Sequence, residues 1–339
     1  MSNSILEATR IVLDGADLSA DQMYAAVSQI MDGEAGEIAI ASFLTALRVK
    51  GEATSELVGA ARVMRERATK ITTRKTGLLD TCGTGGDVLH TFNISTAAAL
   101  VAAACGVPVA KHGNRSATST SGSADVLEAL GVRIDLPPER VAECIDEVGI
   151  GFCFAQLLHG AMKYAAPVRK QLGFRTIFNN LGPLTNPASA EFQLIGASRV
   201  STADKLARAL AELGVGRALV VCGAGELDEV SLWGETAVFE VSSDGVSLCG
   251  WSHETFELPS CQVEDLQVDS VAQSANIIRR ILEGEKGPAR NVVLANTAAA
   301  LFAARHVVSP VEGVAAATAA IDTGKAAELV AQLVQWTNS

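Results

Sequence analysis

The chain has few aromatic residues, few cysteines and no long apolar run. Aromatic side chains make up 4% of the 339 residues, and the seven cysteines are scattered without CxxC spacing. This usage argues against a disulfide framework or a cysteine-rich zinc site and favours reduced thiols. The longest apolar stretch, residues 97–110, contains Gly106 and Pro108 and is too short to span a membrane. Residues 1–10 lack a signal-peptide core, so we expect a cytoplasmic protein with no membrane partner.

Acidic residues are missing from two long stretches of a chain that is acidic overall. The net charge is −11, yet no Asp or Glu occurs in residues 88–124 or 148–190. The basic side chains within these stretches are Lys111, Arg115, Lys163, Arg169, Lys170 and Arg175. Their local positive potential suits the capture of small anions, although Lys163 and Lys170 also fit solvated charges on a helix face. The overall negative charge argues against nucleic-acid binding.

Hydrophobic residues make up 48% of the chain, which is enough for the core of one large domain or two smaller ones. Residues 1–70 carry only helical patterns, including a capping-box sequence at 19–22. A polar linker at 69–76 leads into residues 75–339, where strand and helix patterns alternate. We therefore expect a helical domain followed by an α/β domain. Its strand candidates are residues 78–82, 107–110, 151–155, 193–197, 218–222 and 237–241.

The sequence GTGGD at residues 83–87 follows the first strand candidate directly. Glycines there allow backbone geometry that leaves N–H groups free to face anionic oxygens. Asn93–Thr96 supply N-cap side chains for a helix over residues 97–105, which Gly106 ends. The loop and the positive end of this helix together predict a phosphate site.

A second device of the same kind follows. The strand candidate 107–110 is succeeded by KHGNR at residues 111–115, a hydroxyl-rich loop at 116–123 and a short helix that Gly131 ends. Each piece alone also fits a plain interpretation: a βα turn, a helix cap or a solvated turn. Their succession within residues 80–128 favours a binding site for a phosphorylated sugar.

These motifs resemble the anthranilate phosphoribosyltransferase family of tryptophan biosynthesis, and the likeness covers essentially the whole chain. The segments that carry it are GTGGD, NIST, KHGNR and SGSADVLEALG, followed in the same order by residues 161–163, 166–170, 175–179, 181–187 and 227–232. The resemblance implies an α/β fold of the nucleoside phosphorylase/phosphoribosyltransferase type. A small N-terminal helical domain, joined by a later helical segment near 161–187, would pack beside a larger, mostly parallel α/β domain. It also implies a homodimer and an active site between the domains.

The resemblance implies transfer of the 5-phosphoribosyl group from 5-phosphoribosyl 1-diphosphate to the amine of anthranilate. Carried over by position, the 5-phosphoribosyl 1-diphosphate site consists of Gly83, Gly86, Asp87, Thr91, Asn93, Ile94, Ser95, Thr96, Lys111, His112, Gly113, Asn114, Arg115, Ser116, Ala117, Thr118, Ser119 and Ser123. Anthranilate would contact Gly83, Asn114 and Arg169, because a guanidinium suits a carboxylate.

The same resemblance implies magnesium as cofactor, held by Ser95, Asp228 and Glu229. Magnesium prefers oxygen ligands and commonly joins a few carboxylates to substrate phosphates. From the residues alone, an adjacent acidic pair also fits solvated surface charge. No residue is expected to act as a covalent nucleophile. His112 and Pro183 are expected to form walls of the pocket, and a role of His112 as general base is the weaker alternative.

The chain departs from the family pattern at four positions. The family often has proline where Gly160 stands, a basic residue near Thr120, leucine at Asn180 and histidine at Cys222. No named ligand is lost, so we expect effects on acceptor affinity or hinge rigidity. Two rivals rank lower: a nucleoside phosphorylase of the same fold, whose anion-binding pattern differs from KHGNR, and a non-enzymatic nucleic-acid-binding relative, which would need a basic surface.

Overall fold

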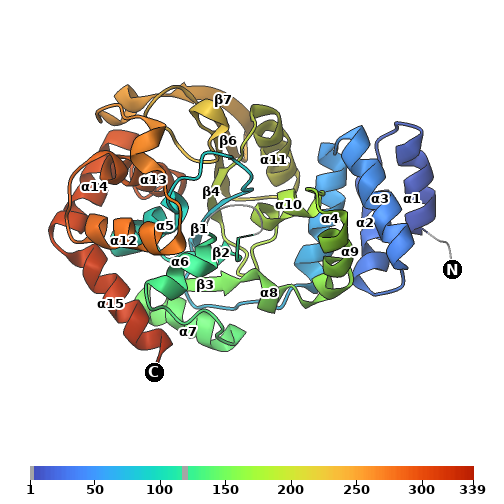
Figure 1. Ribbon diagram of the computed structural model, residues 1–339, viewed down its shortest axis with the longest axis horizontal. Helices are drawn as coiled ribbons and strands as arrows, with labels where there is room; N and C mark the ends of the chain where they lie inside the picture. Colours follow the sequence, from blue (N-terminus) through green and yellow to red (C-terminus); the bar gives the residue numbers. More distant parts are fainter. Residues whose placement is uncertain (1–3, 117–120) are drawn as a thin grey trace.

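The computed structural model describes residues 4–116 and 121–339. A helical unit at one end lies beside a larger α/β unit, and both are seen in Figure 1. The first four helices of the helical unit are α1 (Ser4–Leu13), α2 (Ala20–Met31), α3 (Glu37–Lys50) and α4 (Thr54–Arg67). The predicted capping box forms at α2: the Gln22 amide donates to Ser19 Oγ, and the Ser19 amide donates to Gln22 Oε1.

Close packing of α2 on α4 depends on Gly59. A Cβ at this position would lie 2.8 Å from Met23 Cβ and collide with the Ala20 carbonyl, so only glycine lets the two helices approach this far. Two later helices, α9 (Ala166–Leu172) and α10 (Phe178–Leu181), lie against α3 and α4. Val168 and Phe178 are buried in the same apolar cluster as Phe43 of α3.

The α/β unit is built on one seven-stranded sheet in the order β3-β2-β1-β4-β5-β6-β7. The five strands β3, β2, β1, β4 and β5 are parallel to one another. Strand β6 is antiparallel to β5, and β7 is antiparallel to β6. The strands are β1 (Leu79–Gly83), β2 (Val109–Gly113), β3 (Ile150–Phe154), β4 (Phe192–Gly196), β5 (Arg217–Cys222), β6 (Thr236–Ser242) and β7 (Gly245–Trp251). The chain leaves β1 in one direction for β2 and β3 and returns to its other side at β4, which is where open α/β sheets bind ligands.

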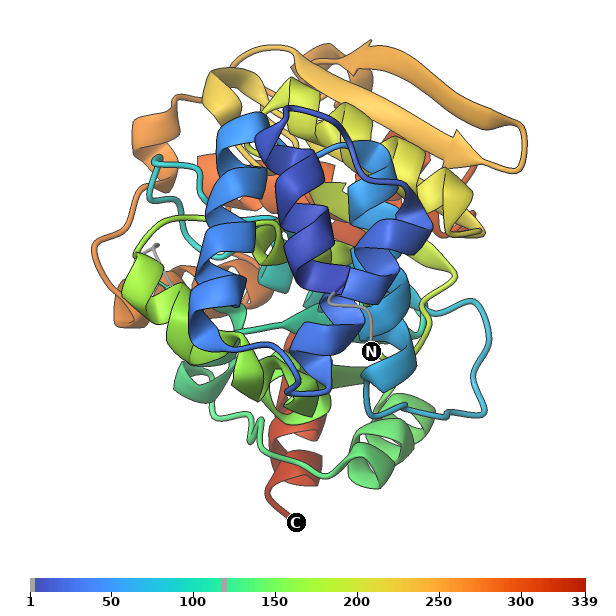
Figure 2. The same cartoon turned by 90° about the vertical axis from the view of Figure 1, so that its right-hand side faces the viewer.

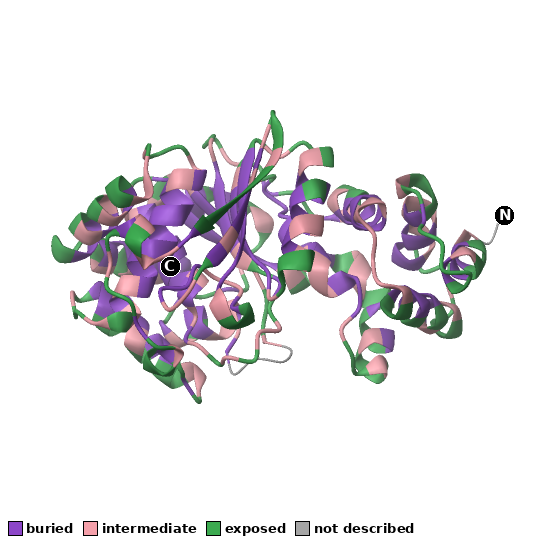
Figure 3. Ribbon diagram, turned by 90° about the horizontal axis from the view of Figure 1, so that it is seen from above, coloured by how far each residue is buried: buried purple, intermediate pink, exposed green. Residues whose placement is uncertain are grey.

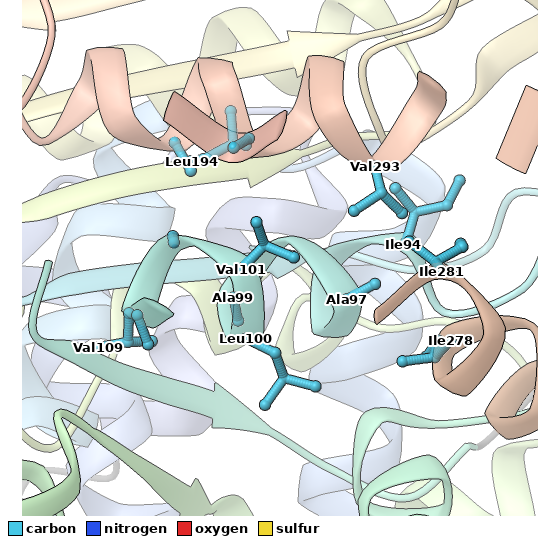
Figure 4. Packing of buried hydrophobic residues seen from close by; sticks show 14 of the residues in the cluster. Ile94, Ala97, Ala99, Leu100, Val101, Val109, Leu194, Ile278, Ile281 and Val293 are labelled. Carbon is cyan, nitrogen blue, oxygen red and sulfur yellow. The ribbon is translucent and has the colours of Figure 1, made fainter. Parts of the chain in front are cut away.

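Helices cover both faces of the sheet. They are α5 (Ile94–Ala104), α6 (Ser123–Ala129), α7 (Pro138–Val148), α8 (Ala155–Leu158), α11 (Val200–Glu212), α12 (Val271–Leu282), α13 (Pro288–Ala303), α14 (Pro310–Asp322) and α15 (Lys325–Thr337). Figure 3 shows the buried ribbon gathered at the sheet and the exposed ribbon on the outer helices. Helix α5 packs between the sheet and the outer helices, and Figure 4 shows Ile94 of α5 beside Val293 of α13; Val101 of α5 and Leu194 of β4 belong to the same core cluster.

The six strand candidates correspond to β1 to β6, and their bounds differ by at most one residue except at β2, which begins two residues later and ends three residues later than predicted. Three details of the prediction were wrong. Residues 111–113 lie inside β2 rather than in a loop after it, because strand pairing with β3 continues to Gly113. Asn93 occupies the N-cap position of α5, but its side chain does not bond the helix amides. Strand β7 was not predicted; it forms the hairpin at the sheet edge in Figure 2.

Two expectations about the chain as a whole can be set against the structure. All seven cysteines are free thiols, as their scattered spacing predicted. Over residues 4–116 and 121–339, no helix is both long and apolar enough to cross a lipid bilayer.

Candidate functional site

A cavity of about 660 Å³ lies at the carboxyl ends of the parallel strands, and α4, α9 and α10 of the helical unit also line it. Most of the residues that the sequence predicted gather around it. Those in the lining are Gly83, Gly86, Asp87, Thr91, Asn93, Ile94, Ser95, Lys111, His112, Gly113, Asn114, Arg115, Ser116, Ser123, Arg169, Asp228 and Glu229. Residues as far apart in the sequence as Gly83 and Glu229 therefore line one cavity.

Four predicted residues are not in this lining. Thr96 is fully buried behind it, where its hydroxyl donates to Asn93 Oδ1, so Thr96 can hold Asn93 but does not face the cavity. Ala117, Thr118 and Ser119 lie outside the described residues.

The glycine loop after β1 is built on left-handed backbone. Gly85 has φ +62° and Gly86 has φ +90°, conformations that residues with a Cβ resist. The Gly85 amide donates to Asp228 Oδ2 at 2.9 Å. A Cβ at Gly83 would lie 3.2 Å from Asp228 Cγ, so the absence of a side chain there gives this carboxylate its place. One loop amide predicted for phosphate thus bonds a carboxylate of the same chain.

The N-terminus of α5 is occupied in the same manner. The Ser95 amide donates to Glu229 Oε1 at 2.9 Å, so the second member of the acidic pair satisfies a helix N-terminal donor. This contact also brings Glu229 next to Ser95, its predicted partner in metal binding. Burial and the neighbouring Asp87 raise the pKa of Asp228 to about 8, and burial and Asp228 raise the pKa of Glu229. A bound cation would relieve the repulsion between these carboxylates.

The described residues hold no group of three His, Cys, Asp or Glu side chains able to bind a metal alone. A metal at the acidic pair would therefore complete its shell with a hydroxyl, water and substrate oxygens. That ligand set suits magnesium, which keeps waters and uses few carboxylates.

Lys111 is almost wholly buried at 2% exposure, and its Nζ donates to the Thr81 carbonyl at 2.5 Å. Burial lowers its pKa, and the negative charge of Asp80 opposes that effect. Asp80 is itself fully buried and accepts hydrogen bonds from the His112 amide and from Asn186 Nδ2. Lys111 is therefore part of a charged network beneath the cavity, rather than a cation projecting freely into it.

His112 and His159 form a buried pair in the cavity wall, at 5% and 6% exposure. His112 Nδ1 donates to the Gly182 carbonyl at 3.0 Å, which leaves its Nε2 as an acceptor. His159 Nε2 lies 3.2 Å from that atom and must be the donor of the pair. The lone pair of His112 is thus already used, which agrees with the expectation that His112 is a wall rather than a base.

Arg115 lies beside the cavity and is engaged by two acids of α6. Its Nη1 is 2.9 Å from Asp125 Oδ1 and 2.5 Å from Glu128 Oε2. The neighbouring Asn114 accepts through Oδ1 from Gln156 Nε2 at 3.1 Å, which directs the amide side chain along the cavity wall.

On the helical side, Arg169 of α9 is partly buried, and its Nη2 lies 3.4 Å from Asn179 Oδ1. Its guanidinium carbon is 5.5 Å from the centre of the Phe178 ring, within range of a cation–π contact. Burial lowers the pKa of Arg169, and the positive charge of Arg175 acts in the same direction. This arginine can receive a carboxylate at the face of an aromatic ring.

Sequence reasoning did not name every lining residue as part of the site. The additional ones include Met64, Gln156, His159, Phe178 and Asn179, and Arg175 was named only among the basic residues suited to anion capture. Most of these lie in the acid-free stretch 148–190, and that shortage of acids was the available signal. Of the positions that depart from the family pattern, Gly160 lines the cavity.

The chain matches two family models along most of its length. Residues 75–327 match the model of the α/β domain of a glycosyl transferase family, and residues 6–68 match the helical bundle domain of that family. The anthranilate phosphoribosyltransferase of Geotalea uraniireducens is 49% identical, covering 98% of this chain and 99% of the relative. That of Symbiobacterium thermophilum is 50% identical, covering 97% of this chain and 96% of the relative.

Solved structures agree with these matches. The anthranilate phosphoribosyltransferase of Thermus thermophilus is similar with a TM-score of 0.92 and 43% identity, covering 98% of this chain and 99% of that chain. The Saccharomyces cerevisiae enzyme in complex with PRPP and Mg has a TM-score of 0.91 and 26% identity, covering 100% and 99%. With near-complete coverage at about half identity to several relatives, the chain belongs to the anthranilate phosphoribosyltransferase family.

Proposed function

We propose that this protein transfers the 5-phosphoribosyl group of 5-phosphoribosyl 1-diphosphate (PRPP) to the amine of anthranilate. The products are N-(5-phosphoribosyl)anthranilate and diphosphate, and the reaction belongs to tryptophan biosynthesis. One observation carries this proposal: the glycine loop, the KHGNR strand end, the acidic pair and Arg169 surround one cavity in a member of this family. The S. cerevisiae relative has been solved with PRPP and Mg and with 4-fluoroanthranilate.

PRPP would lie along the glycine loop, the N-terminus of α5 and the end of β2. Proposed direct contacts are Gly83, Gly86, Asp87, Thr91, Asn93, Ile94, Ser95, His112, Gly113, Asn114, Arg115, Ser116 and Ser123. We keep Ala117, Thr118 and Ser119 in the proposed site on the family pattern alone. Thr96 and Lys111 would act indirectly, because one holds Asn93 and the other bonds the β1 backbone.

Anthranilate would lie between the two units, at Gly83, Asn114 and Arg169. The guanidinium of Arg169 can hold the carboxylate through charge-assisted hydrogen bonds. Asn114 can orient the amine, which is nucleophilic without prior loss of a proton. Phe178 and Pro183 give the aromatic ring an apolar wall.

The acidic pair would hold magnesium together with Ser95. Crowding of Asp87, Asp228 and Glu229 favours a cation at this place, as the raised pKa of Asp228 indicates. Bound magnesium would neutralise charge on the diphosphate leaving group.

The chain's own residues would act by position and charge. Loop and strand-end groups hold the ribose with C1 facing the amine, and donors near the diphosphate stabilise its departure. The C1–O bond is largely broken before the C1–N bond forms, giving an oxocarbenium-like transition state and inversion at C1. No covalent nucleophile is required.

Loss of anthranilate fluorescence tests the activity directly. We expect fluorescence to fall only when the protein, PRPP and magnesium are all present, with stoichiometric release of diphosphate. The nucleoside phosphorylase alternative predicts instead phosphate-dependent cleavage of a nucleoside and no change in anthranilate. A result of the second kind would refute the proposal.

A homodimer formed by the helical unit is a further part of the proposal. Ile38 and Val49 of α3 and Leu13 of α1 are 84%, 83% and 70% exposed, which leaves an apolar surface on the two outermost helices. Burial of this surface against a second copy would remove apolar area from water. Sedimentation equilibrium should give twice the mass of one chain; the mass of a single chain would contradict this part. We also propose a cytoplasmic location, which fractionation of cells would test.

We place the domain boundary at the 69–76 linker, with residues 1–70 and the segment near 161–187 forming the helical domain. The contacts of α9 with α3 and of α10 with α4 support this division. The rest of residues 75–339 would form the α/β domain. Hydrogen exchange should show the amides of α9 opening together with those of α3, whereas exchange in step with the central strands would contradict the division.

A further inference from the structure

Arg175 reaches across the cavity from the segment between α9 and α10 to the glycine loop. Its Nη2 donates to the Thr84 carbonyl at 2.8 Å. The guanidinium also lies over the α-carbon of Gly86, since a Cβ at that position would be 2.7 Å from Arg175 Cζ. Glycine at position 86 is therefore required by this arginine as well as by its positive φ.

The guanidinium retains donors that the protein does not use. Its only hydrogen bond within the described part of the chain is the one to Thr84, and no carboxylate there lies within 4.0 Å of its nitrogens. A guanidinium carries five N–H donors in a planar fork. Burial lowers the pKa of Arg175, and the negative charge of Asp228 opposes that effect. A partly buried cation with free donors in a cavity wall is arranged to receive an anion.

Two other basic residues near the loop are already engaged. Lys111 is buried and donates to the Thr81 carbonyl, and Arg115 is paired with acids of α6. The loop amide of Gly85 donates to Asp228. Arg175 therefore offers uncommitted positive charge directly at the glycine loop.

We propose that Arg175 binds the diphosphate group of PRPP on the glycine loop and stabilises its negative charge as the C1–O bond breaks. The electron pair of that bond goes to the diphosphate oxygen, so negative charge grows on the group that the guanidinium faces. Planar bidentate donors match phosphate oxygens better than a point charge does. This inference rests on the proposed placement of PRPP along the glycine loop.

Steady-state kinetics and titration with inorganic pyrophosphate and magnesium test the assignment. In Arg175→Met we expect at least about tenfold weaker pyrophosphate binding, a raised KM for PRPP and a lowered kcat, with the KM for anthranilate almost unchanged. Arg175→Lys keeps the charge without the fork and should be intermediate. Lys170→Met removes one charge from exposed surface of α9 and should match the wild type.

Wild-type pyrophosphate affinity in Arg175→Met would overturn the inference, as would equal losses for both substrates. If Arg175→Met does not fold, Arg175→Lys decides by the same measurements, since a purely structural role would not separate PRPP from anthranilate. A crystal structure with pyrophosphate tests the role of Arg175 separately from the placement of PRPP. Diphosphate on the loop with Arg175 turned away would refute the inference alone, whereas diphosphate elsewhere would refute the placement of PRPP.

Discussion

Because the buried His112–His159 pair stays neutral in the folded state, the ligand-free protein should be strongly sensitive to mild acid. Burial lowers the pKa of His112 to about 4, and burial together with His112 lowers the pKa of His159 to about 3, from an ordinary 6.5. Both groups contribute stability that is complete above pH 6.5 and is lost as the pH falls toward these values. The unfolded chain then binds protons that the folded chain refuses, at about 1.4 kcal/mol per pH unit for each histidine. From pH 6.5, where the unfolded histidines are already half protonated, to pH 5 the pair should cost about 3 kcal/mol, or roughly 1.6 kcal/mol for each histidine.

Substitution His159→Gln isolates half of this cost. The amide can still donate to His112 Nε2 but does not titrate, so the acid-dependent loss should fall by about 1.6 kcal/mol. Urea unfolding at pH 8, 6.5 and 5 measures the free energy of unfolding, and His306→Gln, at an exposed histidine, is the matched control. The prediction would be wrong if the free energy of unfolding fell equally with pH in the wild type and in His159→Gln. It would also be wrong if His306→Gln reduced this acid-dependent loss as much as His159→Gln does.

The remaining predictions concern the metal and the acceptor. Asp228→Asn combined with Glu229→Gln should remove most turnover and shift the magnesium requirement upward, because neutral amides bind a hard cation poorly. The rate is measured against magnesium concentration, with Glu226→Gln, an exposed acid of the same loop, as control. An unchanged curve would show that the pair does not hold magnesium and serves only to bond the Gly85 and Ser95 amides. Arg169→Ala should raise the KM for anthranilate at least about tenfold and leave that for PRPP nearly unchanged, with Lys170→Ala as control. Similar effects on both substrates would contradict the assignment.

Elements with a buried apolar pattern could be predicted from the sequence, and exposed ones could not. Strands β1 to β6 bury most of their side chains, so their apolar runs were visible. Strand β7 exposes most of its residues, including Leu248 at 62%, and is held by backbone pairing with β6. The signal that could have found it is Asp244–Gly245, a dipeptide typical of tight hairpin turns, with Gly245 at φ +116°.

The loops of the candidate site could be predicted from the sequence, but the hydrogen bonds and charge interactions between them could not. Loop motifs are local, so glycines and hydroxyl residues in succession identify them. Burial of Lys111 depends on Thr81 and Asp80 of the neighbouring strand, and the role of Arg175 depends on a contact with Thr84 across 91 positions of sequence. Sequence spacing does not show which of these residues come together until the order of the strands is known. The sequence therefore identified the basic residues but could not show which are buried, which form ion pairs and which keep free donors.

The partners of the acidic pair Asp228–Glu229 could not be predicted from local sequence. Helix and loop amides attract anions, and from the sequence a substrate phosphate was the expected one. In the folded chain Asp228 and Glu229 bond the Gly85 and Ser95 amides. Strand β5 lies beside β4, and the loop that follows β5 passes over Gly196 at the end of β4 to reach Gly83 at the end of β1. Substrate phosphates would thus lie beside the same backbone amides that these carboxylates already bond. Phosphate and carboxylate groups at such short range repel each other unless a cation lies between them. Magnesium binding and PRPP binding should therefore be coupled, since each supplies the charge that the other needs to enter this end of the sheet.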